Sequence, residues 1–160
     1  MLLLADRVKT AEEGKALLRE QIKNGKALEK FRELLLQQGG DVRILEDASL
    51  LPLSAVHFSV KAEAGGYLNH MDTALIGRAS QETGAGRAYK DQPLDFGAGI
   101  IMKKRLGDKV EAGEELAVIY SETEEKCRSA AGFLKQALTF GTTPAELPPL
   151  ILNIISERKG

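Results

Sequence analysis

The stretch that decides the fold class is GIIMKKRLGDKVEAGEELAVIY, which runs from Gly99 to Tyr120. Two turn signals, Gly107–Asp108 and Ala112–Gly113, divide it into short segments. The spacing of apolar residues in these segments is typical of inward-facing side chains on short strands: Val110, Leu116, Val118 and Tyr120. The sequence therefore predicts β structure at the centre of the second half of the chain.

The segment before this stretch predicts strands followed by a helix. Val56–Lys61 alternates apolar and polar residues, which is the period of a strand with one solvent-facing side. Tyr67–Leu68 extends a second short strand. A helix capped by Asp72 or its neighbour then continues until Gly84, where a glycine ends it.

The segment after it predicts a further helix. ETEEKCRSAAGFLKQALTFG, residues 122–141, begins with acidic residues that suit the positive end of a helix dipole. After Pro148–Pro149 comes LILNII, residues 150–155, an apolar run of strand length. Two alternatives remain open for this run, a buried strand or a C-terminal tail that docks on another surface.

The N-terminal part of the chain predicts two helices. Thr10 and Glu13, in TAEE, form a capping-box signal, and Gly25 ends the first helix. The second helix holds the apolar residues of 27–35 and stops at Gly39–Gly40. Each helix carries an apolar stripe, and we expect the two helices to pair through these stripes.

The order of these elements indicates an α/β (α+β) fold, with two leading helices followed by a mixed α/β C-terminal domain. We expect a helical lead-in at 1–45 and the mixed domain at 50–160.

Composition limits the classes of function. The chain has 160 residues, of which 43% are hydrophobic and 28% charged, and its formal net charge is -1. This balance indicates a globular protein that is not steered toward nucleic acid or an anionic membrane. No apolar run approaches the roughly 18 residues of a membrane span. Cys127 is the single cysteine, so no intrachain disulfide forms, and we expect a structural thiol in a cytoplasmic protein.

The sequence shows no recognisable reacting constellation. It contains no GxSxG, HExxH, CxxC or GxxxxGK[ST] motif. His57 and His70 have no carboxylate or cysteine at metal-ligand spacing, so both are expected on the surface. No catalytic, cofactor-binding or metal-binding residue is predicted.

One short motif is a candidate for binding. GAGR, at Gly84–Arg87, places two glycines and an arginine directly after a predicted helix. Glycine lets the backbone bend tightly or approach a ligand, and arginine grips phosphate or carboxylate. The motif is not GxGxxG, since Tyr89 stands three residues after Gly86. Either a helix-ending turn or a binding loop fits the pattern.

Several stretches together resemble the C-terminal region of the pyrimidine-nucleoside phosphorylase and thymidine phosphorylase family. They are NGKALEKFRELLLQQGGD, AGGYLNHMDTALIGRAS, GAGR and LDFGAGIIMKKRLGDKVEAGEELAVIY, in the order in which the family has them. The opening LLLADRVKTAEEGKALL is similar to the helix that enters this region in the family. The joint match covers most of the chain.

The resemblance implies a function for a longer protein. Enzymes of this family cleave a pyrimidine nucleoside with phosphate, giving the free base and (deoxy)ribose 1-phosphate, without a cofactor. They are dimers whose active site lies between an all-α domain and an α/β domain. The residues that grip phosphate and pyrimidine belong to an earlier part of the polypeptide, so none is carried over onto this chain. Residues 1–45 would be the end of the larger α/β domain, and 50–160 the C-terminal α/β domain with a barrel-sandwich-like β portion.

The resemblance also implies a role for the glycine turn. In the family this turn lies toward the cleft between domains, so Gly84, Gly86 and Arg87 are candidates for a domain-closure turn. We expect the chain to act as a structural or closing domain, inactive alone, with the missing N-terminal catalytic part of the same enzyme as its partner. A homo-oligomer is expected, with phosphate and nucleoside bound only by the full-length enzyme. The base preference is not predicted.

Two alternatives come from other classes of protein. GDKVEAGEELAVI is similar to the hairpin of biotinyl and lipoyl carrier domains, but Thr123 stands where those carriers present a modified lysine, and Lys126 is out of register. The two leading helices also suit a protein-interaction module, because apolar surface left without a partner favours association.

Overall fold

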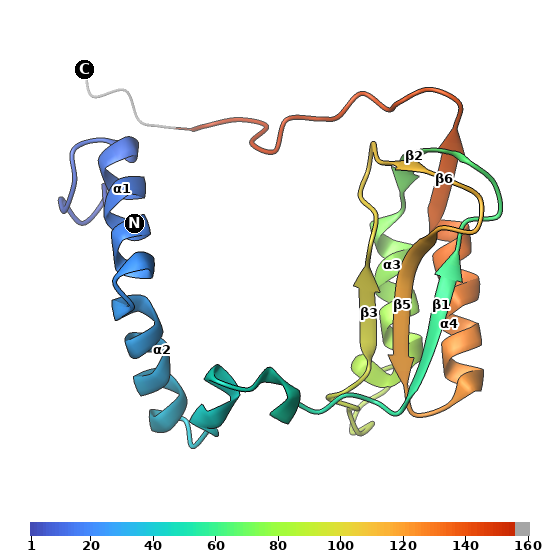
Figure 1. The fold of residues 1–160 in the computed structure, drawn as a ribbon, viewed down its shortest axis with the longest axis horizontal. Coiled ribbons are helices and arrows are strands. Elements are labelled where there is room, and N and C mark those ends of the chain that lie inside the picture. Colours follow the sequence, from blue (N-terminus) through green and yellow to red (C-terminus); the bar gives the residue numbers. More distant parts are fainter. Residues whose placement is uncertain (156–160) are drawn as a thin grey trace. The chain divides into compact units, whose positions relative to one another are not determined.

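The computed structural model describes residues 1–155 and divides the chain into two compact units (Figure 1). The first unit is Met1–Leu51, and the second begins at Pro52. Proline cannot continue a helix or donate a backbone hydrogen bond, so it suits a boundary between units.

The first unit begins with the two predicted helices. In α1 (Ala11–Lys23) the capping box is confirmed, because Thr10 Oγ1 accepts from the Glu13 amide at 3.1 Å and the Glu13 carboxylate accepts from the Thr10 amide at 3.3 Å. Gly25, with a φ of +80°, then leads directly into α2 (Lys26–Gln37). This left-handed conformation favours glycine because a side chain there would clash with the backbone.

The apolar stripes of α1 and α2 lie mostly on the surface, and Ile22 is 71% exposed. Within Met1–Leu51, all of which the structure describes, Gly14 is the only buried residue. The prediction that the helices bury their stripes against each other is therefore wrong. The physical reason is the short connection Asn24–Gly25, which sends α2 onward from α1 instead of back along it (Figure 1). Two short 3-10 turns that the sequence pattern did not predict complete the unit: η1 (Val42–Leu45) and η2 (Ala48–Leu50).

The second unit contains two small antiparallel sheets. The first sheet has β5 (Glu115–Ser121) at its centre, with β1 (Val56–Lys61) on one side and β3 (Gly99–Met102) on the other. Tyr120 marks the register, since it lies opposite His57 on β1 and opposite Gly99 on β3. The strands predicted from Val56–Lys61 and from Gly99 onward are confirmed. The prediction that Tyr120 faces inward is wrong, because Tyr120 is only half-buried and lies outside the core, to which β5 contributes Leu116, Ala117 and Ile119.

The second sheet has β2 (Gly66–Met71) at its centre, between β4 (Lys109–Val110) and β6 (Leu138–Gly141). β6 corrects the sequence prediction, which extended the last helix to residue 141. These four residues pair with β2 instead, Leu138 opposite Met71 and Gly141 opposite Tyr67. Pairing with a distant strand therefore overrides the helical pattern that precedes it.

Two helices cover one face of the first sheet (Figure 1). α3 (Thr73–Ser80) is capped by Asp72, whose carboxylate accepts from the amides of Ala74 at 2.9 Å and Leu75 at 3.0 Å. α4 (Glu124–Ala137) is capped by the hydroxyl of Thr123. Both cap signals follow the rule that a short oxygen-bearing side chain satisfies the free amides of the first turn.

The core lies between these helices and the strands. Its central residue on the sheet side is Ile119, and on the helix side it is Leu134; both are fully buried. The remaining members come from β1, β2, β4, β5, α3, α4 and β6, and from Ala62 directly after β1: Val60, Ala62, Leu68, Val110, Leu116, Ala117, Ala79, Cys127, Ala130, Ala131 and Leu138. The core thus draws on every major element of the second unit except β3, whose Ile100 and Met102 pack against its edge.

The apolar run 150–155 forms no strand, and Leu150 is 100% exposed. The buried-strand alternative is therefore wrong. Pro148–Pro149 supply no amide hydrogens for a sheet ladder, which explains why the run does not continue β structure. The alternative of a docking tail stays a prediction.

The mixed α/β fold class is confirmed, while the barrel-sandwich arrangement of the strands stays a prediction. None of the helices in residues 1–155 combines the length and hydrophobicity needed to cross a membrane.

Leu134→Ala should strongly destabilise the second unit. The side chain is fully buried on α4, so its removal leaves a cavity and should lower the free energy of unfolding by about 2–5 kcal/mol. Ile101→Ala is the matched control, because Ile101 is a 47% exposed side chain of β3 and its loss should cost less than about 1 kcal/mol. Urea unfolding followed by circular dichroism measures both, and equal losses would contradict this description of the core.

Candidate functional site

The predicted glycine turn forms the end of α3. After Ser80 the helix widens into a π-type turn, η3 (Gln81–Ala85), inside which Gly84 has a φ of +100°. Glycine is required there because few other residues adopt the left-handed conformation. Gly84 is also buried, and an added Cβ would lie 3.5 Å from the side chain of Asp95. The sequence therefore located both the end of the helix and the residue that ends it.

Two buried hydroxyl groups fasten this turn to the core. Thr83 Oγ1 donates to the carbonyl of Ser80 at 2.7 Å, and Ser121 Oγ, on β5, donates to the carbonyl of Thr83 at 2.6 Å. Thr83 and Ser121 have no solvent-exposed surface. Satisfied buried hydrogen bonds of this kind fix the local backbone, because breaking one leaves a polar group unpaired in the interior.

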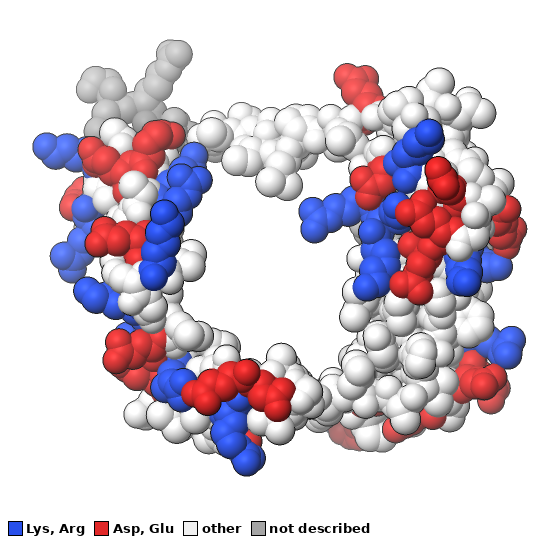
Figure 2. Space-filling model, in the orientation of Figure 1, with Lys and Arg blue, Asp and Glu red and all other residues white. Residues whose placement is uncertain are grey.

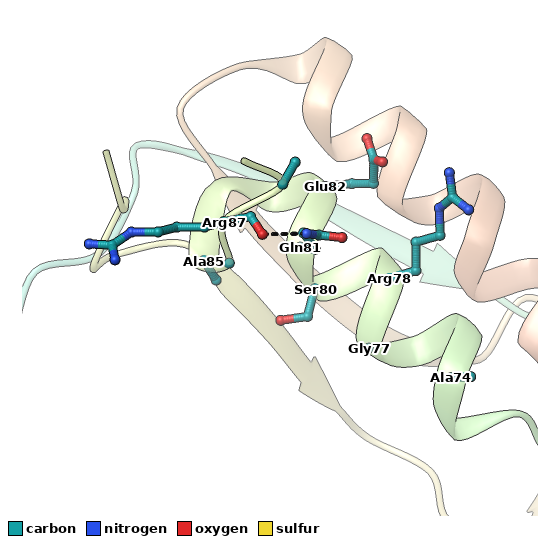
Figure 3. Close-up of a pocket in the computed structure, with 10 residues that line it drawn as sticks. Ala74, Gly77, Arg78, Ser80, Gln81, Glu82, Ala85 and Arg87 are labelled. Carbon is teal, nitrogen blue, oxygen red and sulfur yellow. Dashed lines mark hydrogen bonds between the residues drawn. The ribbon is translucent and has the colours of Figure 1, made fainter. Parts of the chain in front are cut away.

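Arg87 lies on the surface just beyond the turn. Its Nε donates to the carbonyl of Gln92 at 3.1 Å, and the Gln92 side chain accepts from the amide of Ala88 at 2.7 Å. Gln81 donates its side-chain amide to the carbonyl of Arg87. The guanidinium points away from the other residues drawn in Figure 3, and no ion pair among residues 1–155 involves it. Its end is therefore available to a group outside the second unit.

A carboxylate that sequence reasoning missed closes the loop that follows. The amide of Asp95 donates to the carbonyl of Gly84 at 3.0 Å. Its two carboxylate oxygens accept from the Ser54 hydroxyl at 2.6 Å and from the Gly97 amide at 2.9 Å. Ser54 in turn donates its amide to the carbonyl of Gly97 at 3.0 Å. The Asp-Phe-Gly sequence was the available signal, since Asp commonly bonds the backbone two residues on.

An open pocket of about 530 Å³ lies beside the turn (Figure 3). Its lining combines small residues with two arginines and a few polar side chains: Ala74, Gly77, Arg78, Ser80, Gln81, Glu82, Ala85, Gly86, Arg87 and Ala88. Arg78 stacks over the ring of Phe133 at 4.8 Å, and Glu82 accepts from the Ser129 hydroxyl at 3.1 Å. The pocket therefore brings together Gly86 and Arg87, whereas Gly84 is buried and does not line it.

The arrangement suits contact with another surface better than chemistry. Catalysis needs a nucleophile or an acid–base pair held near a reacting atom. Arg87 instead offers hydrogen-bond donors for a carboxylate or phosphate, in a pocket that small residues line together with Arg78 and Glu82. Within residues 1–155, no cluster of three or more His, Cys, Asp or Glu could hold a metal ion.

The remaining candidate residues have structural positions. Cys127 is completely buried, and burial, with a smaller contribution from Glu124, raises the pKa of its thiol, which disfavours the reactive thiolate. Thr123, the residue at the carrier-lysine position, is the cap of α4. The nearby Lys126 pairs with Glu122 at 2.9 Å, a contact that raises the pKa of Lys126. The carrier alternative therefore lacks a presented amine.

Comparison with known proteins relates the sequence to a described family. Residues 67–141 match the family described as Pyrimidine nucleoside phosphorylase C-terminal domain. The match runs from β2 to β6 and includes α3, the glycine turn and α4. The chain corresponds to the C-terminal region of the pyrimidine-nucleoside phosphorylase family. The family predicted from the quoted stretches is thus confirmed.

Relatives in this family match almost the whole chain. A pyrimidine-nucleoside phosphorylase of Bacillus subtilis is 44% identical over 157 residues, which cover 98% of this chain and 36% of the relative. Those of Staphylococcus haemolyticus and Geobacillus stearothermophilus are 42% and 33% identical, again over 98% of this chain and 36% of the relative. The chain thus spans about a third of the length of the phosphorylases that it matches.

Two glycine substitutions near the turn should have opposite effects on stability. In Gly97→Ala the new Cβ would lie 2.5 Å from the backbone nitrogen of Ser54, so the loop must shift at a cost of about 1–3 kcal/mol. In Gly77→Ala, inside α3, the new Cβ meets nothing within 4 Å, and the better helix former should add about 0.5–1 kcal/mol. Thermal melts compare the two variants, and a neutral Gly97→Ala would contradict the close approach of Gly97 to Ser54.

Arg87→Ala should scarcely change the stability of this chain. The side chain is exposed and makes one hydrogen bond to a backbone carbonyl, so its removal should shift the free energy of unfolding by no more than about 1 kcal/mol. Chemical denaturation of the wild-type and Arg87→Ala chains measures the difference. A loss of several kcal/mol would mean that Arg87 stabilises its own unit, and would leave no reason to assign it to docking.

Proposed function

We propose that this chain forms the C-terminal domain of a pyrimidine-nucleoside phosphorylase, an enzyme that uses phosphate to cleave a pyrimidine nucleoside into free base and (deoxy)ribose 1-phosphate. The observation that carries the proposal is the match of 98% of the chain, at 44% identity, to the Bacillus subtilis phosphorylase. The family match over residues 67–141 supports the assignment to the C-terminal domain.

The role of this domain in the reaction is to help position and enclose the two reactants. It contributes no catalytic residue of its own. In phosphorolysis a phosphate oxygen forms a bond to C1′ of the sugar while the bond from C1′ to the base nitrogen breaks, and the electron pair leaves with the base. Water must be kept from competing with phosphate, and both reactants must be held in line. A rigid turn that docks against the catalytic part contributes to both requirements.

Gly84, Gly86 and Arg87 form the domain-closure turn in this proposal. The buried bonds of Thr83 and the left-handed Gly84 support it, because they hold the turn in one shape before any partner arrives. A preorganised surface loses less conformational entropy on contact. The free end of the Arg87 guanidinium would bind a carboxylate or a backbone carbonyl of the catalytic part.

The first unit would be the end of the larger α/β domain of the same enzyme, with residues 50–160 as the C-terminal domain. The exposed stripes of α1 and α2 support this assignment, because a unit with a single buried residue needs further chain to cover its apolar face. The N-terminal catalytic part is then the main partner. Homodimers, a cytoplasmic location and a reaction without cofactor belong to the same proposal, and the free thiol of Cys127 is consistent with a reducing compartment.

A fused enzyme tests the function. The chain should replace the matching region of the Bacillus subtilis relative, and release of uracil and thymine from their nucleosides should be followed in phosphate buffer. We expect turnover by the fused protein and none by this chain alone, because the groups that bind phosphate and base lie outside it.

The matched controls are the fused protein without phosphate and the same N-terminal part without this chain, both of which should be inactive. Turnover by the isolated chain that a substitution within it abolishes would overturn the assignment. A folded fused protein without phosphorolysis activity would do the same.

A further inference from the structure

An exposed aromatic side chain lies directly after Asp95, at the end of the loop that begins at Gly84. The hydrogen bonds that join Asp95 to Gly84, Ser54 and Gly97 hold this loop closed and are called the clamp below. Phe96 is 83% exposed, although both of its neighbours in sequence are tightly held. Asp95 makes hydrogen bonds with Gly84, Ser54, Gly97 and Ala98, and Gly97 makes a further bond with Ser54. The backbone on either side of Phe96 is therefore fixed, and its ring is presented to solvent from a rigid base.

Leu53 lies beside the same clamp. It is 65% exposed, and an added Cβ on Gly97 would lie only 3.0 Å from its Cα. The hydrogen bond between Ser54 and Gly97 joins the two segments directly after Leu53 and Phe96. On the face drawn in Figure 2, this end of the second unit is mostly uncharged, whereas lysine, arginine and acidic side chains gather toward the opposite end.

The loop carries three side chains of types that are enriched in protein interfaces. Arg87 and the 67% exposed Tyr89 precede Phe96 in the same loop, which the bond between Gly84 and Asp95 closes. Arginine, tyrosine and phenylalanine are enriched in protein interfaces. The side chains that contribute most to the binding free energy are well-packed residues near the middle of the contact. A loop already held by buried and carboxylate hydrogen bonds loses little freedom when it binds.

We propose that Phe96 and Leu53 form the apolar anchor of a contact with the N-terminal part of the same enzyme, with Asp95 as the residue that positions them. This inference rests on the proposed function and names the contact that the domain-closure turn makes. The occupant follows from length, since the chain spans 36% of its relatives and most of each relative lies outside the match. Phe96 and Leu53 imply an apolar hollow on the receiving surface, and Arg87 implies a hydrogen-bond acceptor at the rim of that hollow.

Hydroxyl-radical footprinting tests the contact, because it measures the solvent access of individual side chains. The oxidation rate of Phe96 and Leu53 is compared between the isolated chain and the fused enzyme. We expect a decrease of at least ~fivefold in the fused enzyme, as for residues at an interface core, while Ile101 on β3 keeps its rate. Equal rates for Phe96 in both proteins, whether or not the fused protein is active, overturn the proposal.

Substitutions separate the anchor from the clamp. Phe96→Ala should lower kcat/KM of the fused enzyme at least ~tenfold, as expected for a hot-spot side chain, and leave hydrogen exchange of residues 86–97 in the isolated chain unchanged. Asp95→Asn should speed that exchange, because an amide cannot accept from both Ser54 and Gly97 as the carboxylate does. Ile101→Ala is the control and should change neither readout.

The outcomes also distinguish this inference from the proposed function. An inactive fused enzyme in which Phe96 is protected would overturn the function and support the contact. An active one in which Phe96 stays exposed and Phe96→Ala is neutral would overturn the contact alone. Protection of Phe96 that rises with the concentration of the isolated chain would assign the anchor to a second copy and overturn the proposed partner.

Discussion

The packing of α4 into the core is the contact on which the second unit depends. Its buried side chains recur at intervals of three and four residues, at Cys127, Ala130, Ala131, Leu134 and Ala137. Most of them are small, so the helix lies close to the strands and fills the core with backbone as well as side chain. The same helix contacts β1, β5, β6, α3 and η3, so every element that carries the candidate site packs on it.

Local signals in the sequence predicted most of this fold, and long-range pairing decided the rest. Thr10 with Glu13, and Asp72, marked helix starts because a cap needs only residues within one turn. The strand at Leu138–Gly141 was missed because its partner, β2, lies about 70 residues earlier, and only that pairing favours the extended form. The stripes of α1 and α2 were expected to meet, but their burial depends on the chain direction after Gly25, which an amphipathic pattern does not specify.

The candidate site also combines a part that local sequence signals predicted with a part that depends on long-range contacts. The glycine turn was visible because Gly84 ends a helix in a left-handed conformation. The clamp on the following loop was not, because Ser54 bonds Asp95 across 41 residues and Ser121 bonds Thr83 across 38. No periodic pattern encodes such contacts. The resemblance to the phosphorylases indicated which part of an enzyme this is, whereas the rigidity of the turn and the exposure of Phe96 came only from the structure.

The close approach of Gly97 to Ser54 affects how sequence variation in this region should be interpreted. Any side chain at position 97 would meet the backbone of Leu53 and Ser54, so natural sequences should keep glycine there even in proteins that have lost all activity. Phe96, next to it, is free to change wherever its ring contacts nothing. Among homologues, an invariant glycine would therefore record only the shape of the backbone, and the aromatic residue beside it would be the position whose retention reports selection for a partner.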